Sequence, residues 1–161
     1  MKNLLLLAFA VLILTGCQND ENPTVLTEIG EWKLEQLTPV RSTEVITAAE
    51  LDFTETYHFR ENGTFSKFST RAEMELSGTY ETVPVDPDDR FDPMLVRQLI
   101  LTFDSDQYEA ILDREEGSNR AYVDLYIYGV DNFEVLGLRN DNSLSNGGHR
   151  SHGDFLVYTR K

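Results

Sequence analysis

The chain has 161 residues, about the length of one domain. With 40% hydrophobic and 26% charged residues, it is neither a collagen-like repeat nor a disordered tail, and it lacks the several long apolar runs of a polytopic membrane protein. The formal net charge of -14 at pH 7 would repel nucleic acid and the headgroups of an anionic bilayer. We therefore expect no nucleic-acid partner, and we expect any membrane attachment to be hydrophobic or covalent.

The N-terminal residues have the features of an export signal. Lys2 provides a short positive region, and an apolar run extends from Leu4 to Leu14. This run is too short to span a bilayer, but it has the length of the hydrophobic part of a signal peptide. Leu14-Thr15-Gly16-Cys17 follows and resembles the lipobox of bacterial lipoproteins, in which the cysteine is acylated and becomes the new N-terminus.

The lipobox resemblance implies three parts: a signal peptide at 1–16, lipidated Cys17 with a flexible tether at 17–27, and one domain at 28–161. We expect fatty acyl chains such as palmitate on Cys17 to hold the protein to the bacterial outer membrane. Asp20-Glu21 also resembles the acidic signal that sends some Gram-negative lipoproteins to the cell surface. Solvation of a linker explains the same pair, so the sequence leaves the membrane face open.

From Glu28 onward, polar and apolar residues alternate with a period of two, which is typical of half-buried strands. Asn62-Gly63 separates two aromatic runs, so we expect a tight turn joining antiparallel strands at 51–59 and 64–69. With a first strand opening at Gly30, further strands are predicted at 73–83, 95–103, 107–112, 120–128, 133–139 and 154–160. Many short strands at this spacing indicate an all-β sandwich or barrel.

Three segments interrupt this pattern. Thr47 and Glu50 have the spacing of a capping box, which predicts one or two helical turns near Ala48. Residues 84–93 are rich in proline and aspartate, and we expect them outside the sheet interior. Residues 140–153 carry Asn, Ser, Gly and His and are predicted to form an exposed loop.

The two ends of the predicted domain resemble those of a calycin-type barrel. Gly30-Glu31-Trp32 opens the first strand, and Tyr158-Thr159-Arg160 closes the last. The pattern is similar to that of the lipocalin-like domain found in many short bacterial lipoproteins. The resemblance implies an antiparallel up-and-down barrel of eight to nine strands. In it Gly30, Trp32 and Arg160 have a structural role, with the guanidinium lying over the indole and closing one end.

A barrel of this strand number can enclose one small ligand or fill itself with side chains. Our leading prediction is noncatalytic binding of a small apolar or amphipathic molecule inside the barrel. The residues predicted to line the site are Phe53, Tyr57, Phe59, Phe65, Tyr80, Leu99, Leu101 and Phe103, with Glu55 and Arg97 as polar anchors. Because an unpaired buried charge is costly, Glu55 and Arg97 should meet each other, a water or a polar ligand group, unless both reach solvent at the rim.

The alternative is a cell-surface interaction module whose barrel is filled and takes no small ligand. Its contact patch would be Tyr122, Tyr126 and Tyr128, or the loop near His149. The sequence contains no G-x-S-x-G, H-E-x-x-H or P-loop motif, so we expect no enzyme. A barrel enzyme remains a third alternative, although the sequence singles out no residues for it.

Metal binding is not expected. His149 and His152, with Asp154 nearby, have no matching distant ligand motif. Asp86, Asp88, Asp89 and Asp92 lack the glycine and the closing glutamate of a calcium-binding loop. We therefore predict no metal and no other cofactor.

Overall fold

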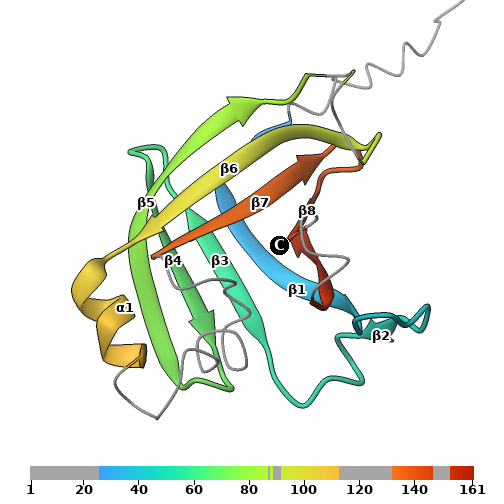
Figure 1. Ribbon diagram of the computed structural model, residues 1–161, viewed down its shortest axis with the longest axis horizontal. Helices are drawn as coiled ribbons and strands as arrows, with labels where there is room; N and C mark the ends of the chain where they lie inside the picture. The colour runs from blue at the N-terminus through green and yellow to red at the C-terminus, as the bar shows by residue number, and fades with distance from the viewer. Residues whose placement is uncertain (1–25, 87, 89–91, 113–131, 147–152) are drawn as a thin grey trace, which may run out of the picture.

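The computed structural model describes residues 26–86, 88, 92–112, 132–146 and 153–161. In this part of the chain, one antiparallel sheet curls on itself until β1 pairs with β9 (Figure 1). Eight strands close the barrel, and the short β2 lies outside the ring, paired with β1. The strands are β1 (Gly30–Thr38), β2 (Ile46–Thr47), β3 (Glu55–Phe59), β4 (Thr64–Ser69), β5 (Met74–Pro84), β6 (Leu95–Phe103), β7 (Phe133–Arg139), β8 (Ser143–Ser145) and β9 (Phe155–Arg160). The predicted all-β barrel is confirmed.

The predicted hairpin is also confirmed, although its first strand, β3, begins at Glu55 and not at Leu51. β3 and β4 pair with Glu55 opposite Ser69 and Phe59 opposite Phe65. Gly63 has a φ of 76°, a left-handed conformation that glycine adopts without strain, and the Asn62 side chain accepts a hydrogen bond from the Thr64 amide at 3.2 Å. The local sequence therefore fixes this turn.

The helix predicted near Ala48 is wrong. Ile46 and Thr47 pair with β1 as β2, and Ala48 donates its amide proton to the Glu35 carbonyl at 2.8 Å. The expected contact between Glu50 and the Thr47 amide does form, at 2.8 Å, but it closes a turn. Pairing with β1 satisfies the backbone here in place of a helix.

The helix of the described chain is α1 (Ser105–Leu112), where we predicted a strand at 107–112. Asp104 accepts hydrogen bonds from the amides of Asp106 and Gln107, at 3.1 and 3.3 Å, and so acts as the N-cap. Tyr108 and Ile111 are three residues apart and both are buried, which is helical spacing. Residues 104–106 therefore form the N-cap and the first turn of this helix.

Two further boundaries differ from the prediction. The loop expected at 140–153 contains β8, whose three residues are too few to show alternation. β5 ends one residue later than predicted, at Pro84, which lies opposite Arg97 in the last pair of that ladder. The strand predicted at 120–128 lies outside the described residues.

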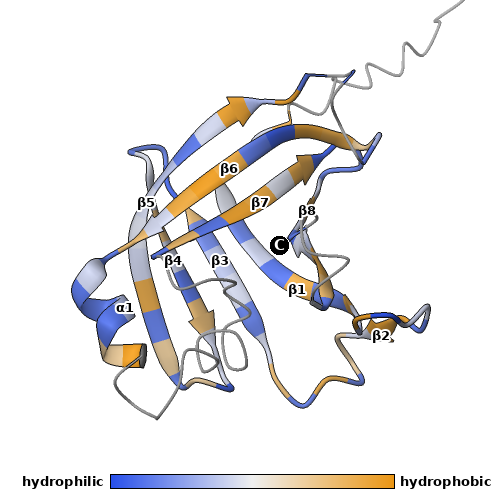
Figure 2. Ribbon diagram, viewed as in Figure 1, coloured by the Kyte–Doolittle hydropathy of each residue, from blue (hydrophilic) through white to orange (hydrophobic). Residues whose placement is uncertain are grey.

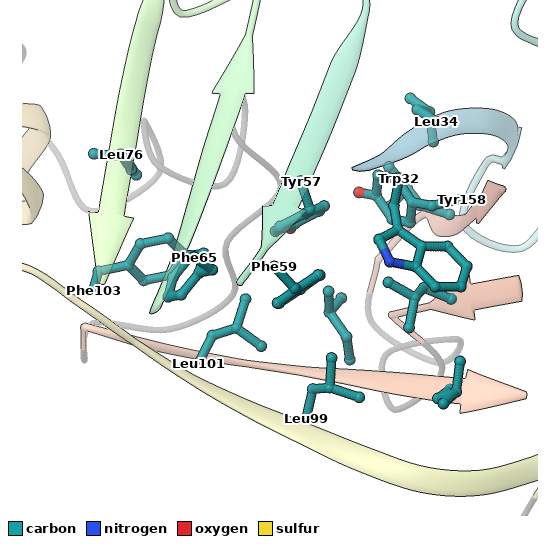
Figure 3. Close-up of a cluster of buried hydrophobic side chains, with 14 of the residues drawn as sticks. Trp32, Leu34, Tyr57, Phe59, Phe65, Leu76, Leu99, Leu101, Phe103 and Tyr158 are labelled. Carbon is teal, nitrogen blue, oxygen red and sulfur yellow. The ribbon is translucent and has the colours of Figure 1, made fainter. Parts of the chain in front are cut away.

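One hydrophobic core fills the barrel. Hydrophobic and hydrophilic residues alternate along several strands, as two-faced strands require (Figure 2). The inward side chains point toward one another between the strands (Figure 3). The largest fully buried side chains are Trp32, Tyr57, Tyr158, Phe59, Phe65, Lys67, Phe103, Leu34, Leu76, Leu99 and Leu101. All but one of these are apolar or aromatic, and the exception is a lysine.

Trp32 and Arg160 lie opposite each other on β1 and β9, as expected. The Arg160 guanidinium carbon lies 5.5 Å from the centre of the Trp32 ring, and its Nη2 donates to the Ile29 carbonyl. Gly30 has a φ of 127°, and a Cβ there would lie 3.2 Å from the Arg160 Nε. Position 30 therefore requires glycine, because a larger residue would be strained at this φ and would press on the Arg160 guanidinium.

Candidate functional site: a buried polar cluster inside the barrel

Most of the predicted ligand-lining residues are inside the barrel and fully enclosed. Tyr57, Phe59, Phe65, Leu99 and Leu101 each have 0% of their surface exposed. A side chain beside an empty cavity that admitted water would keep accessible surface facing that cavity. These five side chains therefore border no water-sized void. Their role in ligand binding stays a prediction, because a ligand could reach them only by displacing other side chains.

Aromatic rings account for much of this filling. The ring centres of Phe59 and Phe65 are 6.1 Å apart, and those of Phe65 and Phe103 are 5.2 Å apart. Phe103 also packs against Tyr108 of α1, and their ring centres are 6.1 Å apart. Phe53 is also buried, whereas Tyr80 is half-buried and packs edge-on against Phe59. The chain of ring contacts extends across β3, β4 and β6.

Glu55 and Arg97, predicted as anchors, do not meet. Arg97 is half-buried and pairs with Glu28 across 2.9 Å, at a position that still reaches solvent. It therefore fits the rim interpretation. Glu55 is 0% exposed, so the rim interpretation is wrong for this residue. Its ion-pair partner is Lys67, which the sequence analysis did not identify.

Lys67 joins two carboxylates within the barrel. Its Nζ lies 3.4 Å from Glu55 Oε1 and 3.4 Å from Glu134 Oε2. Lys67 comes from β4, Glu55 from β3 and Glu134 from β7, and all three are buried. Glu55 Oε1 and Glu134 Oε2 are therefore no more than 6.8 Å apart, which is the sum of the two 3.4 Å distances.

Two tyrosines complete what we call the polar cluster: Glu55, Tyr57, Lys67, Glu134 and Tyr158. The Tyr57 hydroxyl donates to Glu134 Oε2 at 2.8 Å, and the Tyr158 hydroxyl donates to Glu55 Oε1 at 2.5 Å. The two tyrosine rings meet edge to face, with centres 5.1 Å apart. These contacts join β3 to β7 and to β9, so the polar cluster spans the interior of the barrel.

Burial sets the electrostatics of the polar cluster. Loss of solvation raises the pKa of Glu55 to about 7, against the lowering effects of Lys67 and the Tyr158 hydroxyl. The same loss raises the pKa of Glu134, although Lys67 and Tyr57 oppose it. Burial next to carboxylates raises the pKa values of Tyr57 and Tyr158 well above 10. The tyrosines therefore stay neutral and act as hydrogen-bond donors, whereas Glu55, with a pKa of about 7, can exchange a proton near neutral pH.

One atom of the polar cluster lacks a hydrogen bond. Glu55 Oε2 is buried and has no hydrogen-bond partner among the described residues, whereas Oε1 accepts from Tyr158. Both oxygens of Glu134 face Lys67, and one of them also accepts from Tyr57. An unsatisfied buried carboxylate oxygen destabilises the ionised form, so Glu55 is the less well stabilised of the two carboxylates in the polar cluster.

The sequence held a partial signal for the missed residues. Glu134 is on the same face of its strand as Leu136 and Leu138, just as Glu55 is on the same face as Tyr57 and Phe59. Period two alone could therefore have placed Glu134 inside the barrel. Lys67 was harder, because Phe65 and Phe68 put an aromatic residue on each face of β4, and the outward Phe68 is exposed.

A second feature lies on the outer face of the barrel. A groove of about 540 Å³ separates β1 and β9 from the segment that follows β1. We call it the β1–β9 groove, and it is lined by Gln36, Thr38, Pro39, Arg41, Ser42, Val45, Arg139, Asp141, Gly153, Phe155 and Val157. Val45 is 49% exposed, and Val40 in the same segment is 39% exposed. The groove therefore combines apolar side chains with both signs of charge.

Several predicted features lie outside the described residues. These are the signal peptide and Cys17, the tyrosines at 122, 126 and 128, His149, His152 and Asp89. The described residues contain no group of three or more His, Cys, Asp or Glu side chains arranged to hold a metal ion. No helix among the described residues has the length and hydropathy needed to cross a membrane.

Comparison with known proteins adds no family to this description. No family model matches the sequence, and neither the curated proteins nor the solved structures yield a significant match. The closed antiparallel barrel is consistent with a calycin-like fold. That consistency depends on the strand order and on the barrel's closure alone.

Proposed function

We propose that this chain is a noncatalytic interaction module of the bacterial envelope, built on a filled lipocalin-like barrel and carried on a lipid anchor at Cys17. The observation that supports it is the polar cluster, whose hydrogen bonds cross the space where a barrel ligand would lie. Five described inward side chains, Tyr57, Phe59, Phe65, Leu99 and Leu101, are 0% exposed and border no water-sized void. A barrel filled in this way acts as a scaffold, and recognition then falls to its outer surface.

The β1–β9 groove is the partner surface that we favour. The exposed Val45 and the lining side chains of Phe155 and Val157, beside polar and charged neighbours, provide the mixture of apolar and polar contacts found in protein interfaces. Arg139 is 11% exposed and lies within 4.0 Å of Asp92 and Asp141, so the exposed cation among the lining residues is Arg41. A protein partner with an apolar side chain flanked by a carboxylate would fit it.

Crosslinking from the groove tests this function. A photo-reactive amino acid at Val45 in the full chain, expressed in its own host, should give a discrete crosslinked protein. The same probe at Glu81, exposed on the outer face of β5, is the matched control and should give none. Equal crosslinking from both positions, or none from Val45, contradicts the proposal.

Ligand binding inside the barrel is the second candidate, favoured by the unpartnered Glu55 Oε2. Native mass spectrometry of the purified domain separates the two functions. A small molecule that copurifies reproducibly would replace the interaction module with a ligand-binding barrel. Repeated absence of bound mass, with no thermal shift across a lipid and metabolite panel, supports the filled scaffold.

The lipid anchor has its own test. Metabolic labelling with a radioactive fatty acid should mark the wild-type protein, and Cys17→Ser should abolish both the label and the membrane association. Label that persists in Cys17→Ser would refute lipidation at this cysteine.

A further inference from the structure

We propose that Glu55, Lys67 and Glu134 form a proton switch inside the barrel: one bound proton keeps the interior neutral and closed, and its release loosens the contacts that join β3 to β9. This inference concerns the barrel itself and does not depend on the identity of the partner or on the groove.

The charge count of the polar cluster supports the switch. Lys67 contributes one positive charge, Glu55 and Glu134 contribute one negative charge each, and the side chains are 0%, 0% and 4% exposed. With both carboxylates ionised, the buried group carries one uncompensated negative charge, which is unfavourable away from water. A single added proton makes the group neutral.

The geometry places that proton on Glu55. Both oxygens of Glu134 lie 3.4 Å from the Lys67 ammonium, and one also accepts from Tyr57, so ionised Glu134 has more stabilising contacts than ionised Glu55. Glu55 has one partnered and one unpartnered oxygen. Protonation at Oε2 leaves the Tyr158 hydrogen bond to Oε1 intact. The pKa of about 7 that burial gives Glu55 agrees with this assignment.

The groups that act on Glu55 come from every side of the interior. Lys67 faces it from β4 and lowers its pKa, Glu134 on β7 raises it, and the Tyr158 hydroxyl on β9 lowers it. Tyr57, its neighbour on β3, stays neutral across the relevant range because its own pKa is raised well above 10.

The sign of the pH effect follows from the direction of the shift. The pKa of Glu55 is raised from 4.5 to about 7 by folding, so the folded state binds more protons than the unfolded state between these values. Stability therefore falls as the pH rises through this window and is lowest above it. Loss of the proton leaves a net charge next to the Tyr158 contact, which is one of the links between β3 and β9.

The test is amide hydrogen exchange of the purified domain between pH 5 and 8.5, corrected for the intrinsic pH dependence of exchange. In the wild type, the opening equilibrium of β3 and β9 should rise on the order of 100-fold across this range. Glu55→Gln keeps the shape of the neutral acid and should remove this rise. Glu81→Gln, on the outer face of β5, is the matched control and should retain it.

Two results would overturn the switch: a wild type whose opening equilibrium is independent of pH, or a Glu55→Gln variant that keeps the wild-type dependence. If Glu55→Gln does not fold, carboxyl ¹³C NMR of the wild type decides the matter. A Glu55 carbon that titrates near pH 7 supports the proposal, and one that titrates below pH 5 refutes it.

Discussion

Replacing Lys67 with methionine tests whether the polar cluster stabilises the barrel. Methionine keeps most of the volume of the lysine stem and removes only the ammonium group. That group lies 3.4 Å from each of two buried carboxylates, so its loss leaves both without their cation. We expect Lys67→Met to lower the free energy of unfolding substantially at pH 8, which is above the pKa of about 7 that burial gives Glu55.

The magnitude follows from the burial of all three side chains. Removing one partner of a buried ion pair costs roughly 3–5 kcal/mol, because the remaining charge stays in a poorly solvated site. A typical domain has a free energy of unfolding of about 5–15 kcal/mol, so Lys67→Met would remove a large fraction of the stability. The loss should be smaller at pH 5, which is below the pKa of about 7 that burial gives Glu55, because protonated Glu55 needs no cation.

Urea denaturation at pH 5 and pH 8 measures both values. Lys33→Met, a half-buried lysine on the outer face of β1, is the matched control and should change stability by less than about 0.5 kcal/mol. If Lys67→Met does not fold, the triple variant Glu55→Gln, Lys67→Met, Glu134→Gln should fold, because it leaves no charge inside the barrel. A loss below about 1 kcal/mol at pH 8 would refute the idea that Lys67 compensates the two carboxylates.

Three further predictions concern the closure of the barrel and the helix. Arg160→Ala removes the contact with the Trp32 ring and the hydrogen bond to the Ile29 carbonyl, and should cost about 1–3 kcal/mol in thermal unfolding; a loss near zero would contradict a closing role. Gly30→Ala should destabilise by a similar amount, because the backbone φ is 127° and the new Cβ would press on Arg160; an unchanged melting temperature would contradict this. Asp104→Ala removes the N-cap of α1 and should cost about 0.5–2 kcal/mol, whereas Asp104→Asn should cost less.

Much of the fold could be predicted from local sequence. Alternation with period two locates the strands that are long enough to show it, and β6 and β7 have the predicted bounds. The dipeptide at 62–63 specifies a tight turn because glycine and asparagine tolerate the required backbone. The helix was missed because 104–106 can serve as a turn or as a cap, and local sequence does not decide between them.

The candidate site was likewise only partly predictable from local sequence. Period two places Glu55 on an inward face, since side chains alternate across a strand, and the ends of the chain carry the glycine, tryptophan and arginine that meet at closure. The period of two does not reveal which groups Glu55 contacts. Tyr158 is 103 residues away along the chain, and the Tyr57 to Glu134 bond spans 77 residues. Those partners are set by the order and register of the strands around the closed barrel. The alternation of the sequence therefore determined that Glu55 and its apolar neighbours on β3 point inward, and tertiary structure decided that Lys67 and Glu134 join them and that these groups satisfy one another across the interior.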